Sequence, residues 1–355
     1  MTSDVLVVAS WNIQKNGRAP LNSHDDSPRP HEILAAYQPD IVFRQELSGA
    51  GAHGKRALYA EAHALGGLVA FMGEEHPGRS KNPVGVMVNP RLFDIVAHTN
   101  DDLSWKEICH VEVRRKDCPR TLHLASAHLC HYDPLLRAGE ARRLTTYADH
   151  GHAVLIGMDA NSYPHRTVAE ITDPIDWDTV PDPVHFQHRT IERDSRRVPD
   201  TVPSEILTGG AHPVFTDLAY HAAIALDQRH ALTPTASLHR TDQGPRQRID
   251  VQLATPDLTA ALIAFEVIDT PDITQWTDHA LTITRFDLAA LDCILSTPRS
   301  TMDTRPDEAL RTGGLEGWLA TGRPRDRETN GQCPEPSMSV RRTAGLPRRP
   351  RPRHQ

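Results

Sequence analysis

The sequence is organised around the stretch Leu155-Ile156-Gly157-Met158-Asp159-Ala160-Asn161-Ser162. The apolar run 153–156 predicts a buried strand that is interrupted at Gly157. Asp159 and Asn161 follow two residues apart, so in an extended segment their side chains point to the same side. A carboxylate and an amide at the end of a buried strand lose hydration unless something binds them. Taken alone, the stretch favours an Asx turn that closes a strand, so the rest of the chain must decide between a turn and a site.

Length and composition indicate one large domain followed by a tail. The chain has 355 residues, of which 38% are hydrophobic and 28 are proline. That length is enough for a large core, but the hydrophobic content is low for a chain that is packed throughout. We therefore predict a folded domain over residues 1–295 and a disordered, Arg/Pro-rich tail over residues 296–355.

The charge is divided unevenly between these two parts. The chain has a net charge of −7, whereas residues 296–355 hold 12 Arg and 7 acidic residues, a net of +5, which leaves −12 for residues 1–295. Such an acidic body lacks the basic surface of a strong duplex binder. Some of its carboxylates are candidates for metal ligation. The Arg-rich tail is best interpreted as solvated, with a nucleic-acid or anionic contact as the lesser alternative.

The cysteines and the apolar runs limit the protein class further. The five cysteines are odd in number and have no CxxC spacing, which argues against a disulfide framework and a zinc knuckle. No apolar run approaches the roughly 18 residues that a membrane span requires. The N-terminal residues do not have the form of a signal peptide. We expect a cytoplasmic, monomeric protein without a membrane span.

Short strands dominate the predicted secondary structure. Strands are expected near residues 5–12, 40–46, 84–88, 93–97, 105–113, 121–129, 153–156, 248–253 and 281–286, and helices near 31–37, 55–65, 135–147 and 216–226. Residues 163–213 have little regular pattern, so a long loop is expected there. Many strands with few helices between them favour an α+β fold in which two sheets form a sandwich flanked by helices.

Six places in the sequence share one feature, a polar residue at or just beyond the end of a β-rich run. They are Asn12, Glu46, His128, Asp159 with Asn161, Asp250, and Asp278 with His279. Carboxylates without cysteines suit Mg²⁺ or Mn²⁺ as hard oxygen ligands. A carboxylate can act as a general base on water, and imidazolium or amide groups can stabilise charge that develops on a phosphate. Together these groups meet the requirements of phosphoester hydrolysis.

Each of these residues also has a simpler interpretation. His128 could face solvent from a strand, Asp250 could form a surface ion pair with Arg248, and Glu46 could cap a strand end. Each alternative is plausible alone. All of them must hold at once for the whole pattern to carry no chemistry.

The six places resemble the motifs of the endonuclease/exonuclease/phosphatase superfamily, which includes deoxyribonuclease I and the apurinic endonucleases. The motifs occur in the order of that family over about residues 5–287. They are Ser-Trp-Asn at 10–12, Pro-Asp-Ile-Val-Phe-Arg-Gln-Glu at 39–46, Ala-His-Leu at 127–129, Gly-Met-Asp-Ala-Asn at 157–161, Arg-Ile-Asp at 248–250 and Thr-Asp-His at 277–279. The resemblance implies a four-layer α/β/β/α sandwich like that of deoxyribonuclease I.

The resemblance also implies a role for each residue. Glu46, Asn12 and Asp278 would form the divalent metal site. Asp159 would orient or deprotonate the attacking water, and Asn161 would hold a phosphate oxygen. His279, oriented by Asp250, and His128 would face the scissile phosphate.

The function expected from these roles is Mg²⁺-dependent (or Mn²⁺-dependent) cleavage of a phosphoester by in-line attack of a water at the metal site. A phosphodiester, with nucleic acid as the broad default, is the expected substrate. Two alternatives remain open at this point. One is a phosphatase or phosphodiesterase that acts on a small molecule or a lipid headgroup, and the other is a catalytically inactive binding module on the same fold.

Overall fold

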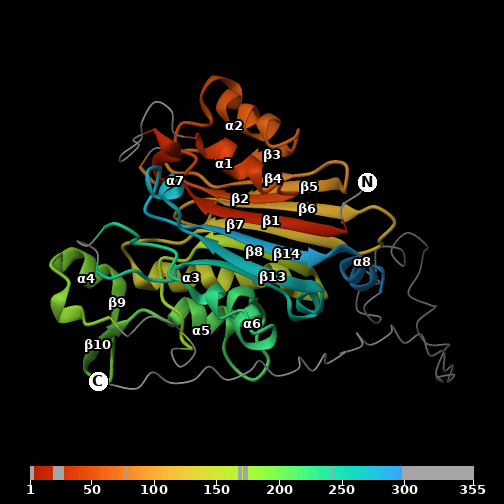
Figure 1. The fold of residues 1–355 in the computed structure, drawn as a ribbon. Coiled ribbons are helices and arrows are strands. Elements are labelled where there is room, and N and C mark those ends of the chain that lie inside the picture. The colour runs from red at the N-terminus through yellow and green to blue at the C-terminus, as the bar shows by residue number, and fades with distance from the viewer. Residues whose placement is uncertain are drawn as a thin grey trace, which may run out of the picture. The chain divides into compact units, whose positions relative to one another are not determined.

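The computed structural model describes residues 4–18, 28–76, 78–166, 170, 175–240 and 244–297. Its strands form two six-stranded sheets and one two-stranded ribbon (Figure 1). The first sheet has the order β13-β14-β1-β2-β4-β3. Its strands are β1 (Val5–Asn12), β2 (Ile41–Gln45), β3 (Val69–Met72), β4 (Gly85–Val88), β13 (Leu262–Ile268) and β14 (Leu281–Asp287).

The second sheet has the order β11-β12-β8-β7-β6-β5. Its strands are β5 (Phe93–Asp101), β6 (Ile108–Arg115), β7 (Thr121–His128), β8 (Ala153–Asp159), β11 (Thr216–Asp217) and β12 (Asp250–Ala254). The ribbon joins β9 (Thr190–Arg193) to β10 (Arg196–Pro199). Each large sheet contains one parallel pair, β1 with β2 and β7 with β8, and its other pairs are antiparallel.

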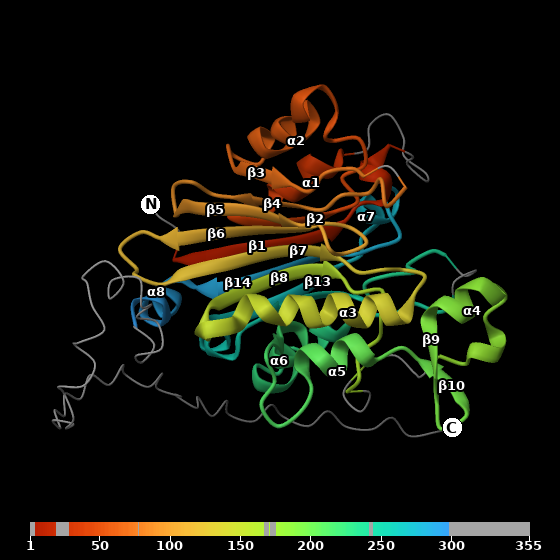
Figure 2. The same ribbon diagram turned by 180° about the vertical axis from the view of Figure 1, so that it is seen from behind.

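Helices connect and cover the sheets. They are α1 (Pro30–Ala36), α2 (Ala52–Ala64), α3 (Pro134–Thr145), α4 (Pro183–Arg189), α5 (Val202–Thr208), α6 (Leu218–Ala225), α7 (Pro271–Thr274) and α8 (Leu288–Ser296). Helices α1 and α2 lie outside the first sheet, and α3 and α5 lie outside the second (Figure 2). None of the helices in the described part of the chain combines the length and the apolar character needed to cross a membrane.

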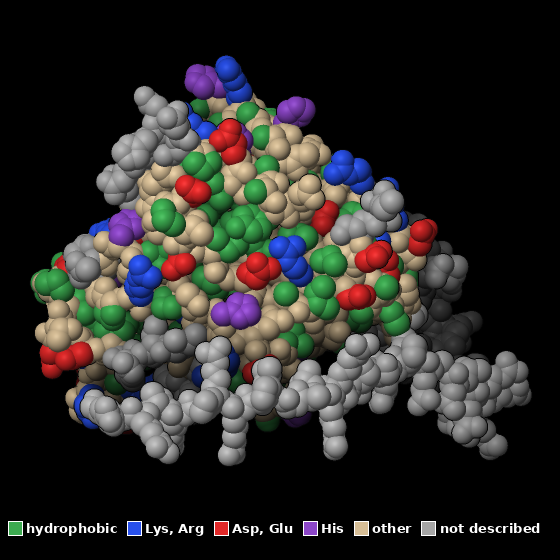
Figure 3. All heavy atoms as spheres, in the orientation of Figure 1, with side chains coloured by type: hydrophobic (Ala, Val, Ile, Leu, Met, Phe, Trp, Pro, Cys, Tyr) green, Lys and Arg blue, Asp and Glu red, His purple; other side chains and the backbone are tan. Residues whose placement is uncertain are grey.

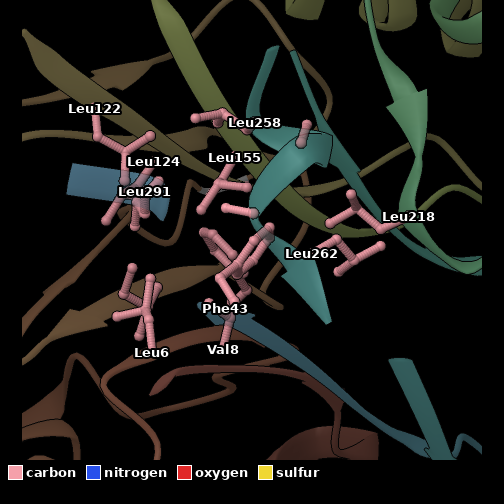
Figure 4. Close-up of a cluster of buried hydrophobic side chains, with 14 of the residues drawn as sticks. Leu6, Val8, Phe43, Leu122, Leu124, Leu155, Leu218, Leu258, Leu262 and Leu291 are labelled. Atoms are coloured by element: carbon pink, nitrogen blue, oxygen red, sulfur yellow. The ribbon is translucent and has the colours of Figure 1, made fainter. Parts of the chain in front are cut away.

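The main core lies between the two sheets, as Figure 4 shows. Alternate residues of each strand point into it, because side chains along a strand alternate between its two faces. On β7 the residues Leu122 and Leu124 enter this core, whereas Ala125 and Ala127 pack on the other face with Leu144 of α3. The chain is thus a four-layer α/β/β/α sandwich, which confirms the predicted fold class.

The two sheets approach each other closely beneath the polar strand ends. A Cβ atom on Gly157 would lie 2.4 Å from the ring of Phe43 in the opposite sheet, so only glycine fits here. The side-chain amide of Gln45 donates to the carbonyl of Gly157 across the same gap, at 3.2 Å. This contact fixes the first sheet against the strand that carries Asp159.

Several local predictions differ from the structure. The region 163–213 is not one long loop, because α4, the β9–β10 ribbon and α5 lie within it. These elements are short, and the residues at the start of α4, Asp182 and Pro183, do not by themselves distinguish a short helix from a loop. Strands β3 and β13 and helix α8 were not predicted. The predicted disorder of the tail concerns residues that, beyond Thr297, lie outside the described part of the chain.

Candidate active site

Three neighbouring strands bring three of the predicted residues into one row. His128 at the end of β7 pairs in register with Asp159 at the end of β8. Asp159 in turn pairs with Asp250 at the beginning of β12. All three side chains are buried. The row forms because β7 and β8 are parallel, whereas β12 runs in the opposite direction and starts where they end.

Asp159 contacts its neighbours through both of its carboxylate oxygens. Its Oδ2 accepts a hydrogen bond from Nδ2 of Asn12 at 2.9 Å and lies 3.2 Å from Nε2 of His128. Its Oδ1 accepts from the backbone N–H of Asn161 at 2.9 Å. Asn161 has a positive φ of 49°, so it is not extended, and an Asx turn does follow β8. The turn and the polar cluster therefore coexist, although the sequence presented them as alternatives.

His279 joins the row through Asp250. Its Nδ1 donates to the carboxylate of Asp250, with distances of 2.9 and 3.1 Å to the two oxygens. The Asp250 backbone N–H donates to the Thr235 hydroxyl at 2.9 Å, which fixes the start of β12. One ligand atom from each of Asp159, Asp250 and His279 lies within 4.8 Å of the others. The geometry is that of an oriented imidazole whose Nε2 remains available.

Two of the predicted strand ends are in fact strand beginnings. Asp250 is the first residue of β12, and Asp278 and His279 precede β14. Strand β14 is antiparallel to β1, so its beginning lies beside the end of β1 that carries Asn12. The polar groups meet at one edge because neighbouring strands run in opposite directions. A single apolar run in the sequence does not indicate the direction of its neighbours.

The three predicted metal ligands occupy different surroundings. Asn12 is buried at the end of β1, and its register partner is Gln45, the residue before Glu46. Glu46 has a positive φ of 57° and accepts a hydrogen bond from the backbone N–H of Lys15 at 2.7 Å. Asp278 is buried, with one oxygen 3.8 Å from Nε2 of His279. Neither Glu46 nor Asp278 belongs to the 4.8 Å group around Asp159.

These residues fit a hard divalent cation. The Oδ1 of Asn12 is buried and has no hydrogen-bond partner among the described residues, although its amide nitrogen is bound to Asp159. A buried amide oxygen without a partner costs free energy unless a ligand fills its place. The neighbouring donors are carboxylate oxygens, which suit Mg²⁺ or Mn²⁺. The donor set is therefore compatible with the predicted metal.

The two histidines differ in protonation. Burial opposes a charge on His279, but the Asp250 carboxylate outweighs it and raises the pKa of His279 to about 10. Burial also raises the pKa of Asp250, to about 6, which is still below that of His279. At neutral pH the proton therefore resides on the ring, and the pair is an imidazolium with a carboxylate.

The pKa values of His128 and Asp159 are both lowered. Burial, together with Lys106, lowers the pKa of His128 well below its usual value, so its ring is neutral at pH 7. Burial alone would raise the pKa of Asp159, but His128, His279 and nearby cations outweigh it and lower the pKa. Asp159 is thus ionised throughout the physiological range and is better suited to orient a water than to store its proton.

Sequence reasoning missed two cations that act on Asp159, the buried Lys106 and the half-buried Arg189. Lys106 precedes β6, at the edge where β7 ends. Burial lowers the pKa of Lys106 to about 8, although Glu46 and Asp159 oppose this shift. Arg189 ends α4, and its Nη1 is buried without a hydrogen-bond partner among the described residues. Nothing in the sequence distinguishes these two from surface cations.

A buried ion pair holds Arg189 in place. Arg137 of α3 is fully buried and bonds Asp200 at 2.7 Å. The same guanidinium donates to the backbone carbonyls of Cys130 at 2.7 Å and His188 at 2.9 Å. The backbone N–H of Asp200 donates to the carbonyl of Arg189 at 3.0 Å. The segment after β8 is therefore tied to the loop that follows His128.

The simpler interpretations of two residues are wrong. His128 is 6% exposed and does not face solvent. Arg248 does not pair with Asp250; its guanidinium is buried against Glu170 at 2.5 Å and Asp217 at 2.7 Å. Asp250 is consequently free to engage His279. Farther along the chain, Trp177 begins a short 3-10 helix that Asp176 caps, and Trp177 is buried against Tyr163.

Comparisons with known proteins support the same architecture. The family model described as Endonuclease/Exonuclease/phosphatase family matches residues 9–279. The sequence matches no curated protein. Similar solved structures include an endonuclease/exonuclease/phosphatase from Bacteroides vulgatus, with 12% identity, 80% of this chain and 99% of that chain covered, and a TM-score of 0.53.

Two further structures have a similar fold. The AP endonuclease from Archaeoglobus fulgidus is 16% identical over 79% of this chain and 99% of its own, with a TM-score of 0.52. TDP2 from D. rerio is 15% identical over 80% and 99%, with a TM-score of 0.51. The family match covers most of the chain, from the strand that bears Asn12 to His279. The chain therefore belongs to the endonuclease/exonuclease/phosphatase family, whose members act on phosphoester bonds.

Proposed function

We propose that this chain is a Mg²⁺-dependent phosphohydrolase that cleaves a phosphodiester by in-line attack of a water molecule. The observation that carries the proposal is the contact set of Asp159. This buried carboxylate touches Asn12 and His128 and lies within 4.8 Å of the His279–Asp250 pair. An ionised acid beside a charged imidazole provides a water-orienting group and a phosphate-binding group in one place.

Each side chain has a separate task in this proposal. Asp159 accepts a hydrogen bond from the attacking water and aligns it with phosphorus. His279 donates from Nε2 to a phosphoryl oxygen, while Asp250 holds the other side of the ring through Nδ1. His128 donates from its neutral ring to Asp159. One N–H of the Asn161 amide is already used on the carbonyl of Leu129, so a second N–H would contact the phosphate.

Glu46, Asn12 and Asp278 would hold the cation. When bound, Mg²⁺ supplies Lewis-acid stabilisation of the negative charge on the phosphoryl oxygens. The orphaned Oδ1 of Asn12 and the acid-rich edge support this assignment. Only Oε2 of Glu46 accepts from the Lys15 backbone N–H, so its other oxygen is the candidate ligand atom.

A nucleic-acid phosphodiester is the substrate class that we put first. One similar structure is described as D. rerio TDP2 complexed with single strand DNA product. In the present chain, Lys106 and Arg189 supply positive charge next to Asp159. On the face seen in Figure 3, however, acidic and basic side chains are interspersed, without a broad basic area. The net charge of −12 over residues 1–295 favours contact with a short stretch of substrate over a long duplex track.

A small phosphodiester or phosphomonoester is the second candidate substrate. The net charge of −12 over residues 1–295 favours it over a polyanion. The two candidates differ in salt dependence. Binding to a polymer releases counterions from each neutralised phosphate, so the affinity falls steeply with salt, whereas a small substrate shows a shallow dependence. A binding module without activity would bind phosphoesters but would not turn them over.

The test is hydrolysis of a substrate panel by the full chain with Mg²⁺ and with a chelator. The panel contains single-stranded DNA, single-stranded RNA, bis(p-nitrophenyl) phosphate and p-nitrophenyl phosphate. We expect Mg²⁺-dependent product release that is lost in Asp159→Asn. Turnover that persists in the chelator, or in Asp159→Asn, contradicts the proposal. Binding without turnover of any substrate supports the inactive module instead.

A further inference from the structure

A second histidine cluster lies on the outer face of the second sheet. His110 and Glu112 are two residues apart on β6 and therefore share a face, and His123 on β7 is in direct register with Glu112. His123 lies on the same face of β7 as Ala125, which packs against α3. His110 and His123 are 6% and 4% exposed, and Glu112 is half-buried. We call these three residues the outer-face cluster.

The nitrogens of the two rings face each other. Nε2 of His110 lies 3.1 Å from Nδ1 of His123, and one ligand atom of each of the three residues lies within 4.8 Å of the others. Two nitrogens on one tetrahedral Zn²⁺, each about 2.0 Å from the ion, are about 3.3 Å apart. The observed spacing is thus close to that of two ligands of one ion, and it requires only small side-chain adjustments.

The opposite nitrogen of each ring is held by a threonine. Nδ1 of His110 lies 3.1 Å from the hydroxyl of Thr99, and Nε2 of His123 lies 3.3 Å from the hydroxyl of Thr121. Metal-binding histidines characteristically donate their second N–H to such an acceptor, which fixes the tautomer and the ring direction. In the metal-free protein one of the two facing nitrogens donates to the other. When both hydroxyls accept, His110 Nε2 and His123 Nδ1 become the lone pairs that an ion can bind.

The surroundings keep both rings fixed and neutral. His110 stacks on Tyr147 with a centroid distance of 4.4 Å, and His123 stacks on His152 at 4.2 Å. Burial, reinforced by the neighbouring histidines, lowers the pKa of His110 to about 4 and that of His123 to about 3. Neutral imidazoles are the form that binds a metal, so no proton has to be displaced at neutral pH.

We propose that His110, Glu112 and His123 form a Zn²⁺ site that is separate from the candidate active site and that clips β6 to β7. Two imidazoles and one carboxylate are an established ligand combination for this ion, with a fourth position left for water. His128 lies five residues beyond His123 on β7, which is about 16 Å along an extended strand, and its side chain points to the opposite face. The outer-face site therefore acts on stability and leaves the hydrolytic groups unchanged.

The experiment measures Zn²⁺ binding to the full chain after removal of metal with a chelator. Calorimetry with Zn²⁺ alone gives stoichiometry and affinity, and Co²⁺ reports coordination geometry by its visible spectrum. The variants are His123→Gln and Glu112→Gln, and the control is His279→Gln, which removes an imidazole from the other cluster. Circular dichroism checks that each variant is folded.

We expect that one of the Zn²⁺ binding events of the wild type persists in His279→Gln and is lost in His123→Gln. In Glu112→Gln its affinity should be at least about tenfold weaker, because loss of even a supporting group at a metal site has such an effect. Zn²⁺ should raise the thermal midpoint of the wild type by more than that of His123→Gln. Unchanged Zn²⁺ affinity in Glu112→Gln and His123→Gln overturns the proposal, as does loss of all binding in His279→Gln. If His123→Gln does not fold, the half-buried Glu112→Gln decides.

Discussion

The candidate active site and the outer-face cluster both include residues of the second sheet, yet they hold histidines in different states. His279 is charged because the carboxylate of Asp250 bonds its Nδ1 and raises its pKa to about 10. His110 and His123 are neutral because burial dominates and their ring partners are hydroxyls and other imidazoles. A directly bonded, buried acid therefore distinguishes the charged imidazole of His279 from the neutral imidazoles of the outer-face cluster.

The two clusters also differ in how the chain builds them. The outer-face cluster comes from two adjacent strands. Its residues lie in one span of 14 residues, from His110 to His123. The candidate active site joins β1, β7, β8, β12 and the segment before β14, which span most of the described chain. Its geometry therefore depends on the whole sandwich, whereas the outer-face cluster depends on one strand pair.

The largest effect is expected for Asp159→Asn. The change removes the ionised oxygen that contacts Asn12 and His128, so the attacking water loses its oriented acceptor. We expect kcat to fall about 10³- to 10⁴-fold, the upper range for loss of such a group. Steady-state hydrolysis of bis(p-nitrophenyl) phosphate with Mg²⁺ measures it. A loss of less than tenfold would mean that Asp159 does not act on the water.

His279→Gln should have the next largest effect. The amide can still donate a hydrogen bond, but it lacks the positive charge that Asp250 maintains on the ring. Loss of one donor to developing negative charge lowers kcat about 10²- to 10³-fold. Asp250→Asn should also lower kcat, because the amide oxygen can still accept from Nδ1 but no longer maintains the positive charge on the ring. Full activity in both variants would remove this pair from the site.

Arg189→Met tests a cation that only the structure reveals. If Arg189 contacts the substrate phosphate, its loss should lower kcat/KM about 10- to 100-fold, the range for a hydrogen bond to a charged group. Arg193→Met is the matched control, because Arg193 forms an exposed ion pair with Glu205 in the same segment. The control should stay within about twofold of the wild type. Equal losses in the two variants would indicate an effect on folding of the segment.

The smallest effect concerns stability of the metal-free protein in acid. His110 and His123 have folded-state pKa values of about 4 and about 3, below the usual 6.5. Above pH 6.5 both rings are neutral in the folded and in the unfolded chain, so they add no pH dependence to the free energy of unfolding there. Between pH 6.5 and 4 the unfolded chain binds protons that the folded chain does not, so the free energy of unfolding falls with decreasing pH.

The free energy of unfolding changes with pH by at most about 1.4 kcal/mol per pH unit for each of the two rings. Urea unfolding of wild type and His123→Gln at pH 7.0 and 5.0 measures it. The stability difference between them should narrow in acid, since the variant has one such ring fewer. A constant difference would show that His123 is not held neutral by burial.

The sequence predicted the parts of the molecule that depend on local pattern. The apolar runs before Asn12, His128 and Asp159 are strands. The alternation over residues 121–129 correctly assigns the side chains of β7 to its two faces. The family motifs identified the sandwich and the residues that meet at its edge. The sequence also suggested the turn after Asp159, which the backbone N–H of Asn161 closes.

Other features depend on contacts between distant segments and were not predictable in this way. Arg189 and Lys106 become relevant only because a buried Arg137–Asp200 pair and the β6–β7 pairing bring them near Asp159. The short helices of residues 175–208 are stabilised by such tertiary contacts and not by a long amphipathic pattern. The outer-face cluster needs the register of β6 and β7, since its histidines are 13 positions apart in sequence.

The most direct test of the central claim compares one histidine from each cluster in the same assay. Hydrolysis of bis(p-nitrophenyl) phosphate at a fixed Mg²⁺ concentration is measured for wild type, His279→Gln and His123→Gln. We predict that kcat/KM falls at least about 10²-fold in His279→Gln and stays within about twofold of wild type in His123→Gln. Equal activity in all three proteins, or a larger loss in His123→Gln than in His279→Gln, would contradict a hydrolytic site at Asp159 and His279.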